Sequence, residues 1–320
     1  MVYLMHITHD IHTHTLLSSC CYDPAATVQA YVRRAAELGH TVFGISNHLW
    51  DEKVPGASSW YRGQMINYGL AARDSIPADT CGVKVMIGAE TEYYAMHDTL
   101  GMLADTAARF DYILVPHSHV HMKGYVCPDP DDVVARRAAM ARKIAESMPY
   151  LSEAQAKKMA ATLPVSELEE LVYADATDLA KFYSTQMINS FEGLMNNPEF
   201  IKLAARVPTS IAHPMHACCI PGEQTAAANR ALPEADLRRC FEQAKKLGVG
   251  IEINVSCFNP TDDYAGEANI RTMKIAKAVG CKFTFGTDSH TLAGLEKIRK
   301  GDRISEILGI TQADLLDVVK

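Results

Sequence analysis

Short apolar segments of the strand type alternate with longer amphipathic segments along most of this chain. The strand-like segments lie at about 7–12, 41–46, 83–88, 111–115, 210–213, 250–254 and 282–285. They show little polar alternation, which is expected of strands that are covered on both faces. The segments between them predict helices at about 23–39, 64–75, 98–109, 234–247 and 266–279. This alternation predicts an α/β protein with seven parallel strands joined by right-handed helical connections.

The first predicted helix carries recognisable signals at both ends. Asp23 is a favoured N-cap residue, and Pro24 follows it at the position where proline suits the first turn of a helix. Gly39 is placed to end the helix in a left-handed C-cap. We therefore expect this helix to begin at Asp23 and to end at Gly39.

The alternation of strands and helices breaks after the fourth predicted strand. Residues 129–206 contain no good strand and predict several helices, with acidic starts at 129–132 and 166–170. A structureless loop of this length would be unusual inside a compact domain. We therefore expect a single domain over residues 1–320, with a helical insertion at about 129–206 after strand four.

Side chains of the metal-ligand type gather where the predicted strands end. His12 and His14 are two residues apart on strand one, so both side chains point the same way. The later strands are followed by His48, Glu90, His117, His119, His121, His213, Asp288 and His290. The carboxyl ends of the strands of an α/β barrel meet at one mouth. Since nearly every strand contributes, the pattern favours a barrel over a doubly wound open sheet.

The residue types in this group indicate which metals they would bind. Imidazoles and carboxylates together select zinc, iron or manganese rather than calcium or magnesium. Six or more imidazoles exceed what one tetrahedral zinc ion could use. The sequence therefore predicts two or three divalent metal ions, with Glu90 available to bridge two of them.

Seven short motifs, in order along the chain, resemble those of the PHP (polymerase and histidinol phosphatase) family. They are Asp10-x-His12-x-His14, Ile45-Ser46-Asn47-His48, Gly88-x-Glu90, the histidine-rich stretch 117–121, Ile211-Ala212-His213-Pro214, Ile251-Glu252-Ile253-Asn254 and Gly286-Thr287-Asp288-Ser289-His290. Each motif alone is weak, but all of them in order are specific and span nearly the whole chain. The resemblance implies a distorted (β/α)7 TIM-like barrel with a trinuclear metal centre, which agrees with the seven strands counted above.

The resemblance also implies a ligand set for each of the three ions. The first ion would be held by His12, His14, Glu90 and Asp288, the second by Glu90, His119 and His213, and the third by His48, His290 and Cys20. Relatives often have histidine or aspartate at the place of Cys20. A thiolate is a fair zinc ligand, but Cys20 could equally be a small buried residue, with Asp23 serving instead.

Several assignments near this centre stay open at the level of the sequence. His117, His119 and His121 alternate and could share a face; His119 aligns best with the motif. Glu92 is the alternative if Glu90 is misassigned, and Glu252 could lie near the metals without being a ligand.

The activity that the resemblance implies is metal-dependent hydrolysis of a phosphoester. A metal-bridged hydroxide would attack the phosphorus, and Glu90 and Asp288 would act by holding the metals. His121, or His117 if that side chain is the one left free, would protonate the leaving group. The expected substrate is a small phosphomonoester, similar either to histidinol phosphate or to a nucleotide.

Composition narrows the partners and the compartment that we expect. A net charge of −7 with a pI near 6.0 disfavours long nucleic acids and anionic membranes as partners. No apolar run is long enough to span a bilayer. The nine cysteines are an odd, scattered set without a signal peptide, which predicts a cytoplasmic protein.

Two other readings of the sequence remain open. An amidohydrolase-type barrel also begins with His-x-His, but it usually bridges its metals with a modified lysine after strand four, where this chain has histidines. A non-catalytic metal-stabilised domain is the second alternative. The helical insertion would cover the mouth of the barrel and help to choose the substrate, or form a subunit contact in a homo-oligomer.

Overall fold

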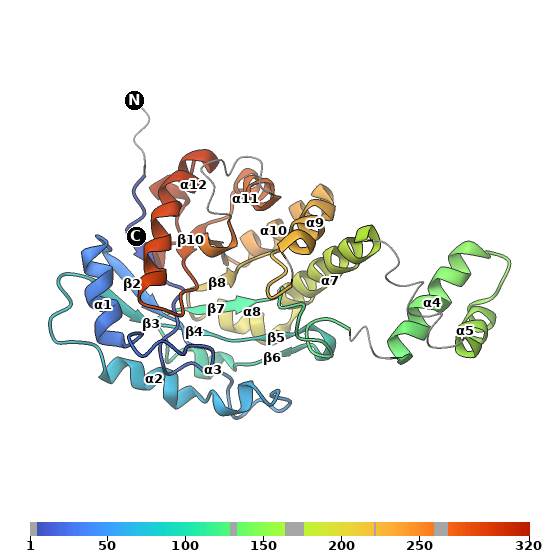
Figure 1. Cartoon of the computed structure of the whole chain (residues 1–320), viewed down its shortest axis with the longest axis horizontal. Coiled ribbons are helices and arrows are strands. Elements are labelled where there is room, and N and C mark those ends of the chain that lie inside the picture. Colours follow the sequence, from blue (N-terminus) through green and yellow to red (C-terminus); the bar gives the residue numbers. More distant parts are fainter. Residues whose placement is uncertain (1–4, 129–132, 164–175, 221, 259–267) are drawn as a thin grey trace.

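The computed structural model describes residues 5–128, 133–163, 176–220, 222–258 and 268–320. Its strands form two parallel sheets and one hairpin (Figure 1). The three-stranded sheet is formed, in spatial order, by β1 (His9–Asp10), β2 (Val42–Ile45) and β3 (Lys84–Ile87). The five-stranded sheet is formed by β10 (Phe283–Gly286), β9 (Gly250–Asn254), β8 (Thr209–Ala212), β7 (Ile113–Pro116) and β4 (Ala89–Glu90). The antiparallel hairpin is β5 (Tyr93–Tyr94) with β6 (Thr99–Leu100).

The two parallel sheets are joined at both edges. On one side, the Ile11 N–H donates to the Phe285 carbonyl at 3.2 Å, and Thr13 forms a parallel bridge with Ser289. On the other side, β3 leads directly into β4. His48, which follows β2, forms a parallel bridge with Glu90 of β4. The predicted α/β class with parallel strands is confirmed. The expected barrel is not one continuous sheet here, since the strands form two sheets that these few contacts link.

A tyrosine side chain fills the space between the two sheets. Tyr112 is buried and donates its hydroxyl to the Ile11 carbonyl at 2.6 Å. A Cβ atom at Gly44 or at Gly88 would overlap the Tyr112 ring or hydroxyl. Glycine at these two positions therefore lets β2 and β3 approach the ring that connects them to the other sheet.

Helices cover the outer faces of the sheets (Figure 1). The α-helices are α1 (Val28–Glu37), α2 (Ile66–Asp74), α3 (Ala104–Ala107), α4 (Val133–Ser147), α5 (Glu153–Thr162), α7 (Ala176–Asn196), α8 (Pro198–Ala204), α9 (Gly222–Ala231), α10 (Glu234–Lys246), α11 (Ala268–Val279) and α12 (Lys300–Leu308). Short 3₁₀ helices are η1 (Tyr61–Gly63), η2 (Ala95–His97), η3 (Val255–Cys257), η4 (Ala293–Arg299), η5 (Gln312–Asp314) and η6 (Asp317–Val319).

Two helix predictions are corrected by the structure. The first helix begins after Thr27, whose side chain accepts from the Ala30 N–H, because the Asp23 carboxylate instead accepts from the backbone of Ala25 and of Leu292. The predicted helix at 98–109 is reduced to α3, since its first half contains β6, the second strand of the hairpin.

The helical insertion at 129–206 divides into two parts. α4 and α5 pack on each other around Met140, Ala141 and Ala160, and Figure 1 shows them standing apart from the rest of the molecule. Arg137 ties the pair together by donating to the carbonyl of Ala160 at 2.6 Å. In contrast, α7 packs against α9 and α10, and α8 packs against α3. The predicted acidic helix starts at 129–132 and 166–170 lie outside the described residues.

The remaining general features concern membranes and cysteines. Over the described ranges, no helix combines the length and the apolar character needed to cross a bilayer. All nine cysteines belong to the described part of the chain, and no disulfide joins any two of them.

Candidate metal centre

A cavity of about 570 Å³ lies at the carboxyl ends of the parallel strands. Its walls include most of the residues that the sequence singled out: Cys20, His48, Glu90, His119, His121, His213, Asp288 and His290. His12 and His14 lie directly beneath them and are fully buried. The structure therefore brings predicted residues from six of the seven strand ends to one place.

Glu90, at the end of β4, is the centre of this arrangement. Its Oε2 atom lies 3.2 Å from His12 Nε2, 3.4 Å from His14 Nε2 and 3.2 Å from His48 Nδ1. Its Oε1 atom lies 3.2 Å from His213 Nε2. Burial alone would raise the pKa of Glu90, but the imidazoles of His48 and His12 hold it well below its usual value. Each carboxylate oxygen thus faces a different group of imidazoles, as a bridging ligand requires.

Asp288 approaches the same imidazoles from the other side of the cavity. Its Oδ1 atom lies 3.2 Å from His14 Nε2 and 3.5 Å from His12 Nε2. Burial opposes ionisation of Asp288, but the two imidazoles lower its pKa below the usual value. Both ring nitrogens of His14 are buried without a hydrogen-bond partner among the described residues. A buried polar group of this kind needs another partner, and a cation between His14 and the carboxylates would supply it.

Four sets of donor atoms are close enough to share an ion, each with its members within 4.8 Å of one another. The sets are His14 with Cys20, His48 and His290; His119 with His213 and Cys218; His12 with His14 and Glu90; and His12 with His213 and Asp288. The first set contains the three residues expected for the third ion together with His14. The second contains His119 and His213 with Cys218 in place of Glu90, and the residues expected for the first ion are divided between the last two sets.

The balance of charge also fits a centre of divalent metal ions. The carboxylates of Glu90, Glu92, Glu252 and Asp288 gather around the imidazoles, and Lys123 is the one lysine or arginine among the described residues that line the cavity. Buried charges in proteins are paired or coordinate metals. The donor types match those that zinc, iron and manganese take in proteins.

Glu252, in the middle of β9, contacts the imidazole of His12 and the backbone of His213 from behind. Its Oε1 atom lies 2.7 Å from His12 Nδ1, and its Oε2 atom accepts the His213 N–H at 2.5 Å. A Cβ atom at Gly286 would overlap both Glu252 and His12, so glycine is needed for this approach. Glu252 therefore lies near the centre without facing it, and it orients His12 and His213.

Glu92 performs the same task for His119. Its Oε2 atom lies 2.6 Å from His119 Nδ1 and accepts a hydrogen bond from the Tyr61 hydroxyl at 3.3 Å. This leaves His119 Nε2 as the ring nitrogen that can bind a ligand. The structure therefore places Glu92 beside Glu90 as an orienting carboxylate rather than as its substitute.

The three alternating histidines after β7 occupy different environments. His117 is buried in the core, where its Nε2 accepts the Met215 N–H at 3.0 Å and its ring contacts Phe191. His121 lines the cavity, and burial together with His119 lowers its pKa to about 4. At neutral pH His121 is therefore an uncharged imidazole that can donate an N–H, and it is better placed than His117 to reach a substrate.

Cys20 lies in the loop after strand one, as expected, with its sulfur facing the centre. Its Sγ is 3.2 Å from the Ser18 hydroxyl, and burial raises the pKa of the thiol to about 12 in the metal-free protein. Asp23, the alternative considered from the sequence, uses its carboxylate to accept from two backbone N–H groups instead. The structure therefore offers Cys20, and not Asp23, to His48 and His290.

Two residues that follow strand ends have strained backbones. His213 has a φ of 30° and Asp288 a φ of 52°, both in the left-handed region that residues other than glycine seldom adopt. Strain of this kind concentrates at functional sites. Here the positive φ turns the side chains of His213 and Asp288 toward the cavity just after their strands end.

Sequence reasoning assigned no metal-binding or catalytic role to Cys218, Tyr61 or Lys123, all of which line the cavity. Cys218 was visible only as half of an adjacent cysteine pair, in a loop without periodic pattern. Tyr61 and Lys123 also lie in irregular segments. The only available signal was their position shortly after a predicted strand, and that signal is shared by many ordinary loop residues.

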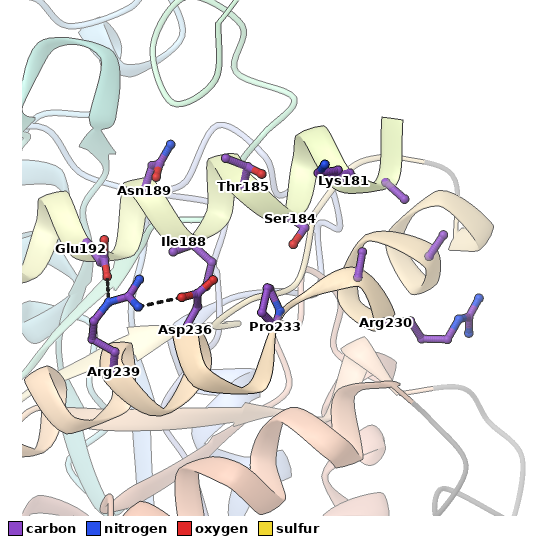
Figure 2. Close-up of a pocket in the computed structure, with 13 residues that line it drawn as sticks. Lys181, Ser184, Thr185, Ile188, Asn189, Glu192, Arg230, Pro233, Asp236 and Arg239 are labelled. Carbon is purple, nitrogen blue, oxygen red and sulfur yellow. Dashed lines mark hydrogen bonds and ion pairs between the residues drawn. The ribbon is translucent and has the colours of Figure 1, made fainter. Parts of the chain in front are cut away.

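A second cavity, of about 640 Å³, lies between α7, α9 and α10 (Figure 2). Its charged groups are partly neutralised among themselves, since Arg239 donates to Glu192 at 2.5 Å and to Asp236 at 2.7 Å. None of the metal-binding sets found among the described residues lies there. The chemistry of the chain is therefore concentrated in the cavity around Glu90.

Comparisons with known proteins agree with this arrangement. A family model described as the PHP domain matches residues 10–193. Histidinol phosphate phosphatase from Lactococcus lactis subsp. lactis, solved with zinc, L-histidinol and phosphate, shares the fold with a TM-score of 0.53 and 15% identity, covering 94% of this chain and 93% of that one. A candidate histidinol phosphatase from Listeria monocytogenes has a TM-score of 0.48 and 11% identity over 90% of this chain and 97% of its own. No curated protein matches the chain. Since the PHP domain model matches more than half of the 320 residues, this chain belongs to the PHP domain family.

Proposed function

We propose that this protein is a metal-dependent phosphoesterase that hydrolyses a small phosphomonoester. The observation that carries the proposal is the position of Glu90, whose two oxygens face four imidazoles contributed by three different strand ends. Two or three ions of zinc, manganese or iron would be held by His12, His14, Cys20, His48, Glu90, His119, His213, Asp288 and His290. Bound there, the ions would supply a water of lowered pKa and neutralise charge that develops on the phosphoryl oxygens.

The side chains around the centre have separate tasks in this proposal. Glu252 and Glu92 hold the imidazoles of His12 and His119 in fixed directions. Lys123, on the cavity wall, attracts the anionic phosphate group. His121 donates an N–H hydrogen bond to the leaving oxygen.

The cavity favours a small substrate over a polymer. A volume of about 570 Å³ is in the range of small-molecule sites. Trp60, Tyr61 and Tyr125 line it, so an apolar or aromatic leaving group would find a surface to pack against. Histidinol and phosphate bound to the structural neighbour from Lactococcus lactis support a substrate of this general kind. The net charge of −7 argues against long nucleic acids.

The proposal is tested by measuring phosphate release from a panel that contains histidinol phosphate, nucleotides and other phosphomonoesters. The protein is stripped of metal and loaded separately with zinc, manganese and iron. His12→Ala is the inactive variant, and His6→Ala is its matched control, since His6 is exposed and pairs with Asp302 away from the cavity. Release in the wild type and in His6→Ala, but not in His12→Ala, supports a phosphoesterase.

The opposite result separates the alternatives. Absence of phosphate release with every metal contradicts the proposal. Turnover of amides or lactones under the same conditions would then point to an amidohydrolase-type activity. Loss of the fold on chelation, without any turnover, would point to a metal-stabilised domain.

A further inference from the structure

One end of the metal centre contains a sulfur atom that the expected ligand set leaves out. Cys218 lies in the loop after β8, five residues beyond His213, and lines the cavity. Its Sγ atom and one ring nitrogen each from His119 and His213 lie within 4.8 Å of one another. Three donors of the types that zinc prefers thus converge on one point.

The distances within this group suit a shared ion. His213 Nδ1 lies 3.4 Å from Cys218 Sγ. A nitrogen and a sulfur that bind the same tetrahedral zinc ion at ordinary bond lengths are about 3.6 Å apart. His119 has its Nδ1 engaged by Glu92, so its Nε2 remains for a ligand. We propose that Cys218 binds, as a thiolate, an ion that His119 holds through Nε2 and His213 through Nδ1, on the side of the His213 ring away from Glu90.

This assignment has a consequence for metal choice. A thiolate is a soft ligand that favours zinc or iron over manganese and magnesium. With Cys20 beside His14, His48 and His290, each end of the centre would then have one sulfur ligand. The inference rests on the metal centre of the proposed function, but not on the nature of its substrate.

The competing explanation is that the Cys218 thiol only hydrogen-bonds to His213 Nδ1 and thereby positions that ring. Cobalt(II) distinguishes the two, because a cobalt ion with a thiolate ligand shows a charge-transfer band in the near ultraviolet, whereas a cobalt ion with only imidazoles and carboxylates does not. The full chain is stripped of metal and titrated with cobalt(II). The variants are Cys20→Ser, Cys218→Ser, the double variant of these, and Cys219→Ser as the matched control.

Cys20→Ser removes the other sulfur near the centre, so a band that persists in this variant and disappears in the double variant supports the proposal. Cys219→Ser should keep the full band. Circular dichroism and the weaker visible cobalt bands show that each variant is folded and still binds cobalt through its imidazoles. For zinc, X-ray absorption of the Cys20→Ser protein should show a sulfur neighbour at about 2.3 Å.

Two outcomes overturn the inference. A charge-transfer band that is unchanged in Cys218→Ser, or one that is absent from Cys20→Ser although the visible bands show bound cobalt, assigns Cys218 a positioning role only. Failure of cobalt to bind at all removes the metal centre and the inference with it. A normal cobalt spectrum without phosphate release would contradict the proposed function and leave the Cys218 assignment standing.

Discussion

The two ends of the centre each combine imidazoles with a cysteine, but the protein holds them in different ways. At the end that contains Cys20, the His14 ring stacks on His48 and on His290, with centroids 4.6 Å and 4.4 Å apart. At the end that contains Cys218, buried carboxylates hold the two histidines in different ways: Glu92 engages the His119 ring, and Glu252 accepts from the backbone N–H of His213.

This difference indicates at which end the protein holds its ligands in position before an ion binds. Carboxylates that engage the far side of an imidazole fix its tautomer and direction before the metal binds. At the other end, the rings of His48 and His290 hydrogen-bond to the Tyr61 hydroxyl and to a backbone carbonyl, and both ring nitrogens of His14 lack hydrogen-bond partners among the described residues. We therefore expect the Cys218 end to bind its ion more tightly than the Cys20 end, which depends on the ion itself for its order.

Replacing Glu90 should have the largest effect, because its two oxygens serve both ends. In Glu90→Gln the neutral amide cannot bridge two cations, so we expect loss of bound metal at both ends and a fall in turnover of at least about 100-fold. Metal content by mass spectrometry and phosphate release measure the two effects. Glu37→Gln, at an exposed helix position, is the surface control. Retention of the wild-type metal content would refute the bridging role.

Replacing Glu252 should have the next largest effect, because the Glu252 carboxylate contacts both His12 and His213. The amide nitrogen of Glu252→Gln would face either the His12 ring or the His213 N–H, and it cannot accept a hydrogen bond from them. We expect metal affinity to fall about 10- to 100-fold. Competition with a coloured chelator measures this change, and wild-type affinity in the variant would show that Glu252 does not orient ligands.

Glu92→Gln is the variant that separates the two ends. It removes the charged partner of His119 and reaches the stacked rings only indirectly, through the Tyr61 hydroxyl that contacts His48. We therefore expect about tenfold weaker binding of the ion at the Cys218 end and a smaller change at the other end. Ser18→Ala is the matched variant for the other end, since the Ser18 hydroxyl contacts Cys20 and accepts a hydrogen bond from the backbone N–H of His48. Equal loss of both ions in either variant would contradict the separation.

The sequence predicted the centre better where it lies on strands than where it lies on loops. His12 and His14 were predictable because the two-residue period of a strand fixes their common direction. Glu252 also follows from strand geometry, since the register of β9 with β8 and β10 places it between His213 and His12. Cys218 depends on the turn after β8, where His213 adopts a positive φ that no periodic pattern encodes.

The fold shows the same limit. The strand positions agree within a few residues, because each is a short apolar run with turn signals at its ends. The start of α1 was wrong because the Asp23 carboxylate serves Leu292, a partner that is distant in the sequence. The hairpin in place of the first half of the helix predicted at 98–109 depends on pairing between Tyr93 and Leu100, which local propensity does not reveal.

His40, a histidine outside the metal centre, serves as a reference for how protonation of a buried imidazole changes the stability of the protein. His40 lies before β2, is buried, and has its pKa lowered by burial to about 4. Between pH 6.5 and 4 the unfolded chain binds a proton at His40 and the folded protein does not, so stability falls as the pH falls. From pH 7.5 to pH 5 this loss is about 2 kcal/mol.

His40→Gln should remove that part of the pH dependence while leaving metal content unchanged, which makes it the smallest perturbation of the centre. Urea unfolding of the metal-free protein at both pH values measures the difference between wild type and variant. Metal-free protein is used because the imidazoles of the centre also exchange protons for cations. If His40→Gln lost as much stability on acidification as the wild type, the pH dependence would come from other buried histidines, such as His9 and His117, whose pKa values burial also lowers.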